Sequence, residues 1–366
     1  MVEQAAFLVT GGCGFMGTNF IRYILNNYPN CLVFNLDLGP ERHYAATGNN
    51  LKDIEFGEVR YCQHLGISIS DAKDTEELSK ALNALVRTAG ARPIVVVHFA
   101  SETHVTRSES NPSLFYETNF FGTIKFLVLL KDALERRPPK YPTTLIHIST
   151  DEVYGEVSPG VFCRENQKEP GEGRATSPYS KSKALADDFV LNFSRCFSNP
   201  RIVIARPTNN FGPWQFPEKM LARNITRLLR GKNAIVWGEG KQVRDWLFME
   251  DTAKAICLLS EKGEAGTIYN IGANHKPEIP NAEIIRRVVK MMGLPEKRVQ
   301  FIEDPRPQHD FRYAVDTTRI RSLGWKPGNF EEQLAATIKW YQNHASWWEP
   351  LLPEAERIYK EEKKSG

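Results

Sequence analysis

Short apolar runs alternate with longer amphipathic segments from the N-terminus of the chain to Pro207. The apolar runs are rich in β-branched residues and contain few polar positions, which is typical of strands buried on both faces of a parallel sheet. We expect these strands at residues 6–10, 31–37, 93–100, 144–150 and 201–207.

The segments between these runs carry apolar residues at three- and four-residue spacing, the pattern of an amphipathic helix. They lie near residues 15–27, 75–89, 113–136 and 179–196. Strands and helices that alternate in this way predict an α/β fold with a doubly wound parallel Rossmann-type sheet.

The character of the sequence changes after Pro207, where aromatic residues, proline and glycine become frequent, as in PTNNFGPWQFPEK. Strands and helices no longer alternate cleanly there, so we expect a smaller mixed α/β C-terminal lobe. The predicted division is a Rossmann domain at 1–206 to which 245–272 returns, a lobe at 207–244 and 273–345, and a tail at 346–366.

Composition narrows the possible partners. The 366 residues are 41% hydrophobic and carry 47 Lys and Arg against 44 Asp and Glu, without a basic block, so we expect no nucleic acid partner. Because no long apolar run and no basic leader occurs, we also expect no membrane partner. Six cysteines at scattered positions predict reduced thiols, no metal site and a cytoplasmic location.

The stretch VTGGCGFMG follows the first expected strand and leads into the first expected helix. Gly11, Gly14 and Gly17 would allow a tight turn, close approach of a pyrophosphate to backbone N–H groups, and close helix packing. The second expected strand ends at Asp37, where a carboxylate accepts hydrogen bonds from an adenosine ribose and repels a 2′-phosphate. The pattern therefore predicts a dinucleotide site that takes NAD rather than NADP.

The sequence YSKSK places Tyr179 and Lys183 four residues apart on one face of an expected helix. An ammonium beside a phenol favours the phenolate, so we expect the pKa of Tyr179 to be lowered and Tyr179 to act as a base. Such a pair is usually an ordinary surface feature; here it follows a dinucleotide motif, which favours the catalytic interpretation.

In IHISTDEVYGE an apolar strand ends in Thr150 and the adjacent carboxylates Asp151 and Glu152. Asp-Glu pairs are also common in helix caps and surface turns. However, ligands of open α/β folds bind at the carboxyl ends of the strands, which is where this pair is expected to lie.

These motifs, together with HFASETHV, GEGKQVRDWLFMEDTA, YNIG and RPQHDFRYAVD, occur in an order that resembles the nucleotide-sugar 4,6-dehydratases of the extended short-chain dehydrogenase/reductase superfamily, and most closely the dTDP-glucose 4,6-dehydratases. The resemblance covers roughly residues 6 to 342. Its most specific element is the Asp-Glu pair, which epimerases, reductases and decarboxylases of the superfamily generally lack.

The resemblance implies a mechanism of oxidation, elimination and reduction. Tyr179, supported by Lys183, would take the C4 hydroxyl proton while NAD accepts the C4 hydride, and Thr150 would hydrogen-bond the C4 oxygen. Glu152 would remove the C5 proton, and Asp151 would protonate the leaving C6 hydroxyl. The charge of one carboxyl is expected to raise the pKa of the other.

The resemblance also implies binding residues and a homodimer. The implied cofactor residues are Gly11, Gly14, Phe15, Met16, Gly17, Asp37, Ala100, Thr118, Tyr179, Lys183 and Asn210. The implied substrate residues are Thr103, Thr150, Asn209, Lys219, Met220, Arg244, Arg306, His309 and Asp310, in which Arg244 and Arg306 would grip a diphosphate.

The chain departs from the family pattern at Thr106 and Ser68, where aspartate is common in the family. These departures bear on sugar and base preference and on cofactor affinity. The sequence leaves open a UDP-glucose 4,6-dehydratase, an epimerase or decarboxylase of the superfamily, and a dinucleotide-binding scaffold without activity.

Overall fold

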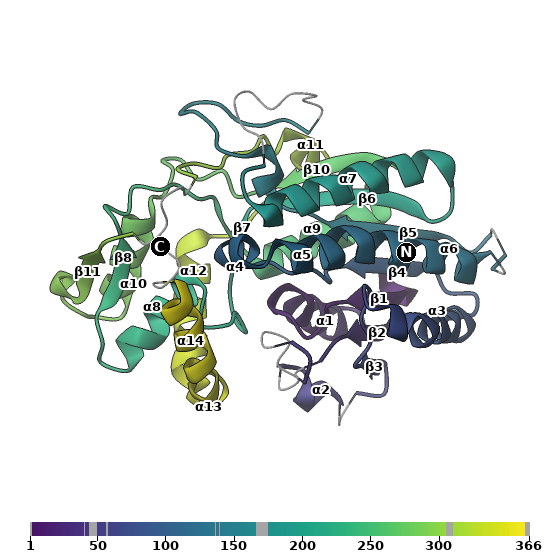
Figure 1. Ribbon diagram of the computed structural model, residues 1–366, viewed down its shortest axis with the longest axis horizontal. Coiled ribbons are helices and arrows are strands. Elements are labelled where there is room, and N and C mark those ends of the chain that lie inside the picture. Colours follow the sequence, from purple (N-terminus) through teal and green to yellow (C-terminus); the bar gives the residue numbers. More distant parts are fainter. Residues whose placement is uncertain are drawn as a thin grey trace.

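The computed structural model describes residues 2–39, 41–43, 50–55, 58–135, 137–138, 140–165, 175–304 and 310–362. Within these ranges the chain forms a large α/β part and a smaller lobe beside it (Figure 1). The last helices of the chain lie along the side of the lobe that faces the larger part.

The described residues of the larger part form a seven-stranded parallel sheet in the order β10-β6-β5-β4-β1-β2-β3. The strands are β1 (Ala6–Thr10), β2 (Leu32–Asp37), β3 (Tyr61–Leu65), β4 (Ile94–His98), β5 (Thr143–Ile148), β6 (Arg201–Pro207) and β10 (Thr267–Ile271). The direction of winding reverses between β1 and β4, as in a doubly wound fold. The predicted fold class is therefore confirmed.

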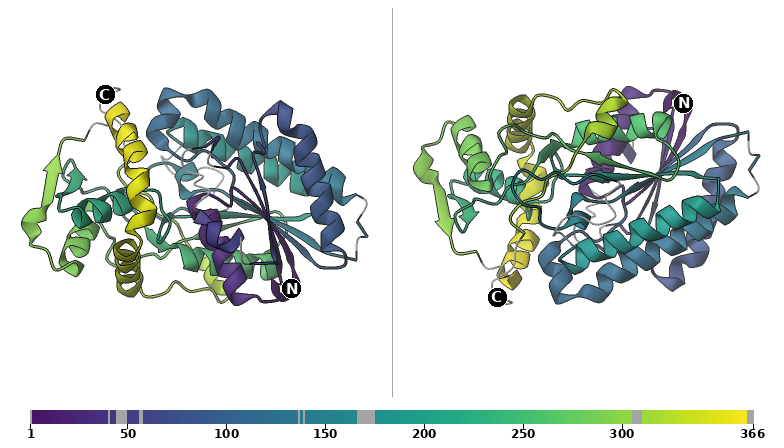
Figure 2. Two further views of the ribbon diagram at one scale, coloured as in Figure 1. Left: turned by 90° about the horizontal axis from the view of Figure 1, so that it is seen from below. Right: turned by 90° about the horizontal axis from the view of Figure 1, so that it is seen from above.

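Helices cover both faces of this sheet (Figure 2). The helices of one face are α1 (Phe15–Asn27), α9 (Met249–Lys262) and α11 (Thr318–Ser322). The helices of the other face are α3 (Thr75–Ala89), α6 (Gly122–Leu134) and α7 (Pro178–Cys196).

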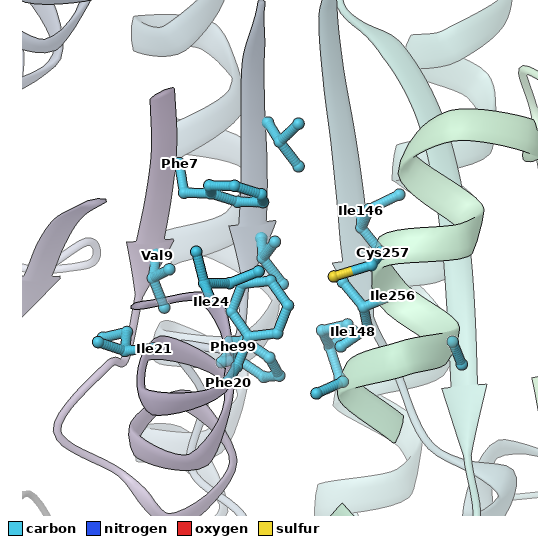
Figure 3. Packing of buried hydrophobic residues seen from close by; sticks show 14 of the residues in the cluster. Phe7, Val9, Phe20, Ile21, Ile24, Phe99, Ile146, Ile148, Ile256 and Cys257 are labelled. Carbon is cyan, nitrogen blue, oxygen red and sulfur yellow. The ribbon is translucent and has the colours of Figure 1, made fainter. Parts of the chain in front are cut away.

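The two faces explain why the strand sequences are apolar almost throughout. Phe7 and Val9 of β1 point into the core beneath α1 and α9, whereas Leu8 between them points into the core beneath α3 and α6. Figure 3 shows the first of these cores, in which the ring centroids of Phe7 and Phe20 are 5.8 Å apart. A strand buried on both sides needs apolar residues at successive positions, not only at alternate ones.

The smaller lobe has its own apolar core, which includes Ile225, Ile285, Leu334 and Tyr341. Its main elements are α8 (Met220–Leu229), β8 (Ala234–Trp237), α10 (Asn281–Met291), β11 (Val299–Ile302) and α12 (Phe330–Asn343), with β8 parallel to β11. A further parallel pair joins β7 (Asn209–Phe211) to β9 (Trp246–Phe248). Within 245–272, α9 and β10 lie on the large sheet, whereas β9 does not.

Several short helical segments lie between these elements. They are η1 (Val2–Gln4), α2 (Lys52–Glu55), η3 (Ala72–Asp74), α4 (Val105–Ser110), α5 (Pro112–Phe115), η4 (Tyr116–Phe121), η5 (Asp151–Tyr154) and η6 (Glu296–Arg298). The helix expected over 113–136 is thus divided, because η4 is a π-helical turn between α5 and α6. Strand β3 was not predicted, because its residues alternate irregularly at a partly exposed sheet edge.

The segment 346–366, expected as a C-terminal tail, is helical over most of its described residues up to 362. The chain folds there into α13 (Ala345–Trp348), η7 (Glu349–Leu351) and α14 (Leu352–Glu362). Trp348 is only 2% exposed and belongs to the core of the lobe. Burial of this large aromatic side chain anchors the segment, which the charged residues that follow it did not indicate.

Candidate active site

The glycine turn lies between β1 and α1 and is packed too closely for side chains. Gly11 has a φ of +72°, and a Cβ atom on it would lie 2.8 Å from the backbone nitrogen of Ala100. A Cβ atom on Gly17 would lie 2.3 Å from the carbonyl oxygen of Gly11. The turn leads into α1 at Phe15, so the helix N-terminus is open to a phosphate group.

Asp37 ends β2 beside this turn. Its Oδ2 accepts a hydrogen bond of 2.9 Å from the backbone N–H of Cys13, and its Oδ1 accepts one of 2.9 Å from Gly39. Burial raises the pKa of Asp37 above the usual carboxyl value, although these backbone bonds oppose the shift. The carboxylate is thus held beside the glycine turn by backbone N–H groups.

A cavity of about 310 Å³ begins at the glycine turn and runs along the carboxyl edge of the sheet. Every residue that the sequence assigned to the cofactor lines it, namely Gly11, Gly14, Phe15, Met16, Gly17, Asp37, Ala100, Thr118, Tyr179, Lys183 and Asn210. The catalytic candidates Thr150, Asp151 and Glu152 line the same cavity. The wall thus combines a glycine turn, a helix N-terminus and a carboxylate, the groups that dinucleotide sites use.

The segment after β5 turns into the 3-10 helix η5, and Thr150 caps it. Thr150 Oγ1 accepts a 3.3 Å hydrogen bond from the backbone N–H of Glu152. Because Thr150 provides the helix cap, neither carboxyl is needed for it, and Asp151 and Glu152 both line the cavity. Among the described residues, Asp151 Oδ2 has no hydrogen-bond partner.

Burial is the main cause that raises the pKa of both carboxyls. It raises the pKa of Asp151 to about 8, helped by the charge of Glu152 and opposed by Arg244. It raises the pKa of Glu152 to about 7, again opposed by Arg244. The neighbouring charge, which the sequence interpretation placed first, is the second cause for Asp151. Near neutral pH this arrangement favours a protonated Asp151 beside an ionised Glu152.

Tyr179 and Lys183 lie at the start of α7, which begins with a capping box between Ser177 and Ser180. The expectation of a lowered pKa for Tyr179 is wrong. Burial of the phenol, and then the charge of Glu152, raise its pKa, and a hydrogen bond with Thr150 offsets only part of this.

The ammonium of Lys183 is anchored at the end of β5. Its Nζ donates a 2.7 Å hydrogen bond to the carbonyl oxygen of Ile148. Burial lowers the pKa of Lys183 to about 8, and the charge of Asp187, one turn further along α7, opposes the shift. The carboxylate therefore helps to keep the buried ammonium charged.

A second cavity, of about 340 Å³, extends toward the lobe. The residues that line both cavities are Thr103, Glu152, Asn209, Glu218 and Lys219. The second cavity is also lined by the predicted substrate residues Met220, Arg244 and Asp310, whereas Arg306 and His309 lie outside the described residues. In the described part of the chain, the buried Oδ1 of Asn209 has no hydrogen-bond partner.

Arg244 is buried in the wall of the second cavity. Its guanidinium donates to the carbonyl oxygens of Asp310 at 2.7 Å and Phe311 at 3.1 Å, and its Cζ lies 4.4 Å from the ring centroid of Tyr313. Arg244 therefore positions the segment that contains Asp310, besides bringing positive charge to the cavity.

The two departures from the family pattern have different surroundings. Ser68 lines the first cavity, but its Oγ accepts hydrogen bonds from the backbone N–H groups of Ser70 at 3.1 Å and Asp71 at 3.0 Å. Its role in the described structure is thus to cap a loop. Thr106 lines the second cavity and is partly exposed.

The sequence interpretation missed several wall residues, which are His43, Asn50, Trp214 and Trp347 in the first cavity and Arg223, Trp237, Gln242 and Tyr313 in the second. Trp214 lies in PTNNFGPWQFPEK and Tyr313 in RPQHDFRYAVD, so these two motifs could have indicated both wall residues. Trp347 comes from the segment assigned to a tail, and nothing local in the sequence indicated it.

Within the described ranges, no helix has the length and apolar character needed to cross a membrane. The same ranges contain no group of three or more His, Cys, Asp or Glu residues that could hold a metal ion.

Comparisons with known proteins agree with this geometry. Residues 7–272 match the NAD dependent epimerase/dehydratase family. The chain is 35% identical over 368 residues to dTDP-glucose 4,6-dehydratase of Neisseria meningitidis, covering 96% of this chain and 97% of that protein. It is 36% identical over 335 residues to the low-salt glycan biosynthesis protein Agl12 of Haloferax volcanii, covering 91% and 97%.

Solved structures give the same result. The dTDP-glucose 4,6-dehydratase DesIV of Streptomyces venezuelae with NAD and TYD bound has a TM-score of 0.81 and 34% identity, covering 94% of this chain and 99% of that chain. The dTDP-glucose 4,6-dehydratase of Bacillus anthracis in complex with NAD has a TM-score of 0.80 and 33% identity, covering 95% and 99%. The chain therefore belongs to the NAD dependent epimerase/dehydratase family, and within it to the nucleotide-sugar 4,6-dehydratases, with NAD as its cofactor.

Proposed function

We propose that the protein removes water from dTDP-glucose to give the 4-keto-6-deoxy sugar. The observation that carries this proposal is the position of Asp151 and Glu152 in the wall of the first cavity. Both carboxyls have raised pKa values, and Glu152 also lines the second cavity. Relatives named dTDP-glucose 4,6-dehydratase support the choice of nucleotide.

In the first step the phenolate form of Tyr179 accepts the proton of the sugar C4 hydroxyl, and Thr150 holds the C4 oxygen by a hydrogen bond. Because burial raises the pKa of Tyr179, this step draws on the ionised fraction of the phenol. NAD, held at the glycine turn and Asp37, would supply the hydride acceptor for C4 and the hydride donor for C6. Lys183 contributes positive charge beside the phenol, because its ammonium is fixed by Ile148 O and kept charged by Asp187. The products of this step are a 4-keto sugar and a protonated Tyr179.

In the second step the 4-keto group makes the C5 proton acidic. Glu152 removes this proton, and Asp151 donates its own to the C6 hydroxyl, which leaves as water, so a C5–C6 double bond forms. The pKa order suits both roles, since Glu152 ionises before Asp151 as the pH rises. Hydride return to C6 and a proton to C5 complete the product.

Substrate binding is assigned to the second cavity. Asn209 offers an unpaired amide oxygen within the described structure, Lys219 and Arg244 bring positive charge to a diphosphate, and Thr103 faces the junction with the first cavity. Met220 and Asp310 form part of the same wall. Arg306 and His309 remain proposed contacts outside the described residues.

The proposal is tested with purified protein, given dTDP-glucose and UDP-glucose in separate reactions and followed by mass spectrometry. We expect loss of one water from dTDP-glucose. Faster loss of water from UDP-glucose would assign a UDP-sugar dehydratase, and an unchanged mass with altered chromatography would assign an epimerase. A lack of any product from either sugar would contradict the proposal.

We also propose that the protein forms a homodimer through α7 and its neighbour η4. Phe121 of η4 is 59% exposed, and Val128 of α6 and Leu185 of α7 are each 43% exposed. Apolar side chains on adjacent helices favour burial against a second copy. Phe121→Asp should yield a monomer by light scattering, whereas Phe301→Asp, at an exposed site on β11, should leave the dimer intact. A monomeric wild type would contradict this assignment.

The cysteines support the proposed cytoplasmic location. The structure describes all six cysteines, and none of them forms a disulfide. Reduced thiols are typical of cytosolic proteins. Detection of the native protein in a secreted fraction with oxidised cysteines would contradict this location.

A further inference from the structure

Trp347, near the end of the chain, lines the same cavity as the glycine turn. Its indole N–H donates a 2.8 Å hydrogen bond to Asn50 Oδ1. The side-chain N–H of Asn50 donates in turn to the carbonyl oxygen of Cys13, within the glycine turn, at 2.9 Å. Because Asn50 is only 1% exposed, these bonds are shielded from water. Two successive hydrogen bonds thus tie α13 to the glycine turn.

Trp347 also belongs to an aromatic cluster that reaches the cavity wall. The ring centroid of Trp214, another wall residue, lies 5.4 Å from that of Trp347 and 4.8 Å from that of Trp340. The guanidinium of Arg22 on α1 lies 4.2 Å from the Trp214 ring. The cluster connects α1, the segment at Trp214 and the C-terminal helices around one side of the cavity.

The backbone conformation of Trp214 is also unusual. Its φ is +64°, in the left-handed region that non-glycine residues seldom adopt. Such a conformation persists where the surrounding structure imposes it, and it is frequent at ligand sites. The packing of Trp214 against Trp340 and Trp347 supplies that constraint.

The neighbouring residue anchors α13 on its other side. Trp348 is buried in the core of the lobe, and its indole N–H donates to the carbonyl oxygen of Tyr341 at 2.8 Å. Helix α13 therefore bridges the lobe, through Trp348, and the glycine turn, through Trp347. Figure 1 shows α13 and α14 between the lobe strands β8 and β11 and the helices α1 and α2.

We infer that Trp347 is a cofactor-retaining residue: it closes the glycine-turn side of the cavity, and NAD leaves only when the contact between Trp347 and Asn50 opens. The indole supplies a flat apolar wall, and its N–H, bonded to Asn50, holds that wall against the glycine-turn side of the cavity. A reaction that returns the hydride within each turnover benefits from a cofactor that stays bound.

The test measures release of NAD from the full-length protein. Each variant is loaded with isotope-labelled NAD, mixed with excess unlabelled NAD, and sampled over time by rapid gel filtration. Trp347→Phe keeps an aromatic ring but removes the N–H donor, so release should be about fivefold faster. Trp347→Ala removes the wall as well and should release NAD faster again. Combining Trp347→Phe with Asn50→Ala should add nothing to the effect of Asn50→Ala.

Trp348→Phe is the matched control, because it removes an equivalent indole hydrogen bond from the same helix on the side away from the cavity. It should lower the melting temperature and leave NAD release unchanged. The inference is overturned if Trp347→Phe and Trp347→Ala both release NAD at the wild-type rate. It is also overturned if Trp348→Phe accelerates release as much as Trp347→Phe, since the effect would then reflect the stability of the lobe.

Discussion

Replacing Glu152 by glutamine should separate oxidation of the sugar from loss of water. The amide keeps the size of the side chain but cannot accept the C5 proton. The charge of Glu152 is the second cause, after burial, of the raised pKa values of Tyr179 and Asp151. Glu152→Gln should therefore lower both pKa values, which leaves Tyr179 at least as able to accept the C4 hydroxyl proton. Oxidation should proceed and elimination should stop.

The pH dependence follows from the two carboxyl pKa values. Elimination needs Glu152 ionised and Asp151 protonated, and the raised pKa of Glu152, about 7, lies below that of Asp151, about 8. Wild-type product formation should therefore fall as the pH drops below about 7, where Glu152 takes up a proton. Glu152→Gln should lower it by about 10²–10⁴-fold, the usual contribution of a general base.

The assay mixes NAD-loaded enzyme with dTDP-glucose and follows reduced nicotinamide by absorbance and the sugar by mass spectrometry. Glu152→Gln should accumulate enzyme-bound NADH without the 4-keto-6-deoxy product. Glu264→Gln, an identical change at an exposed site outside both cavities, should behave as wild type. The reasoning is refuted if Glu152→Gln forms product at the wild-type rate, or if it forms no NADH while Glu264→Gln does.

Three other substitutions test the buried charges around this site. Burial raises the pKa of Asp151 to about 8, so the folded chain keeps a proton that the unfolded chain loses near pH 4, and the protein becomes less stable as the pH rises between these values. Asp151→Asn should therefore raise the melting temperature at pH 8 by about 3–8 °C and change it little near pH 4. A melting temperature below that of the wild type at pH 8 would contradict this. The buried Asp187 accepts a 2.9 Å hydrogen bond from the partly buried Arg206, so Asp187→Asn should cost about 3–5 kcal/mol in denaturant unfolding. A loss no larger than that of the exposed control Asp188→Asn would contradict this. Tyr179→Phe should retain NAD but form no NADH on addition of substrate, and NADH formation at the wild-type rate would assign the C4 base to another residue.

The sequence by itself determined the features that depend on neighbouring residues. Strands buried on both faces need apolar residues at successive positions, so β1 was predicted with its observed bounds of Ala6–Thr10. The glycine turn could be predicted because the close packing at Gly11 and Gly17 leaves no room for a Cβ atom, so glycine is required at both positions. The order of strand, turn, helix and acid then placed Asp37 beside the turn, since adjacent parallel strands end at one edge of the sheet.

The tertiary structure alone decided the features that depend on burial and on distant segments. The sequence showed that Lys183 follows Tyr179 by one helical turn, yet the pKa of the phenol is raised, because burial and the charge of Glu152 dominate its surroundings. The spacing could not show that the ammonium donates to Ile148 O across the fold.

Trp347 is the clearest case of this kind. It stands 297 positions from Asn50, and the contact exists because the packing of the lobe brings α13 back to the glycine turn. Local patterns report on segments of a few turns, whereas desolvation and long-range contacts arise when segments far apart in the sequence exclude water together. For that reason the sequence indicated the candidate catalytic groups, while the folded chain decided their burial, their pKa shifts and the distant residues that line the cavity with them.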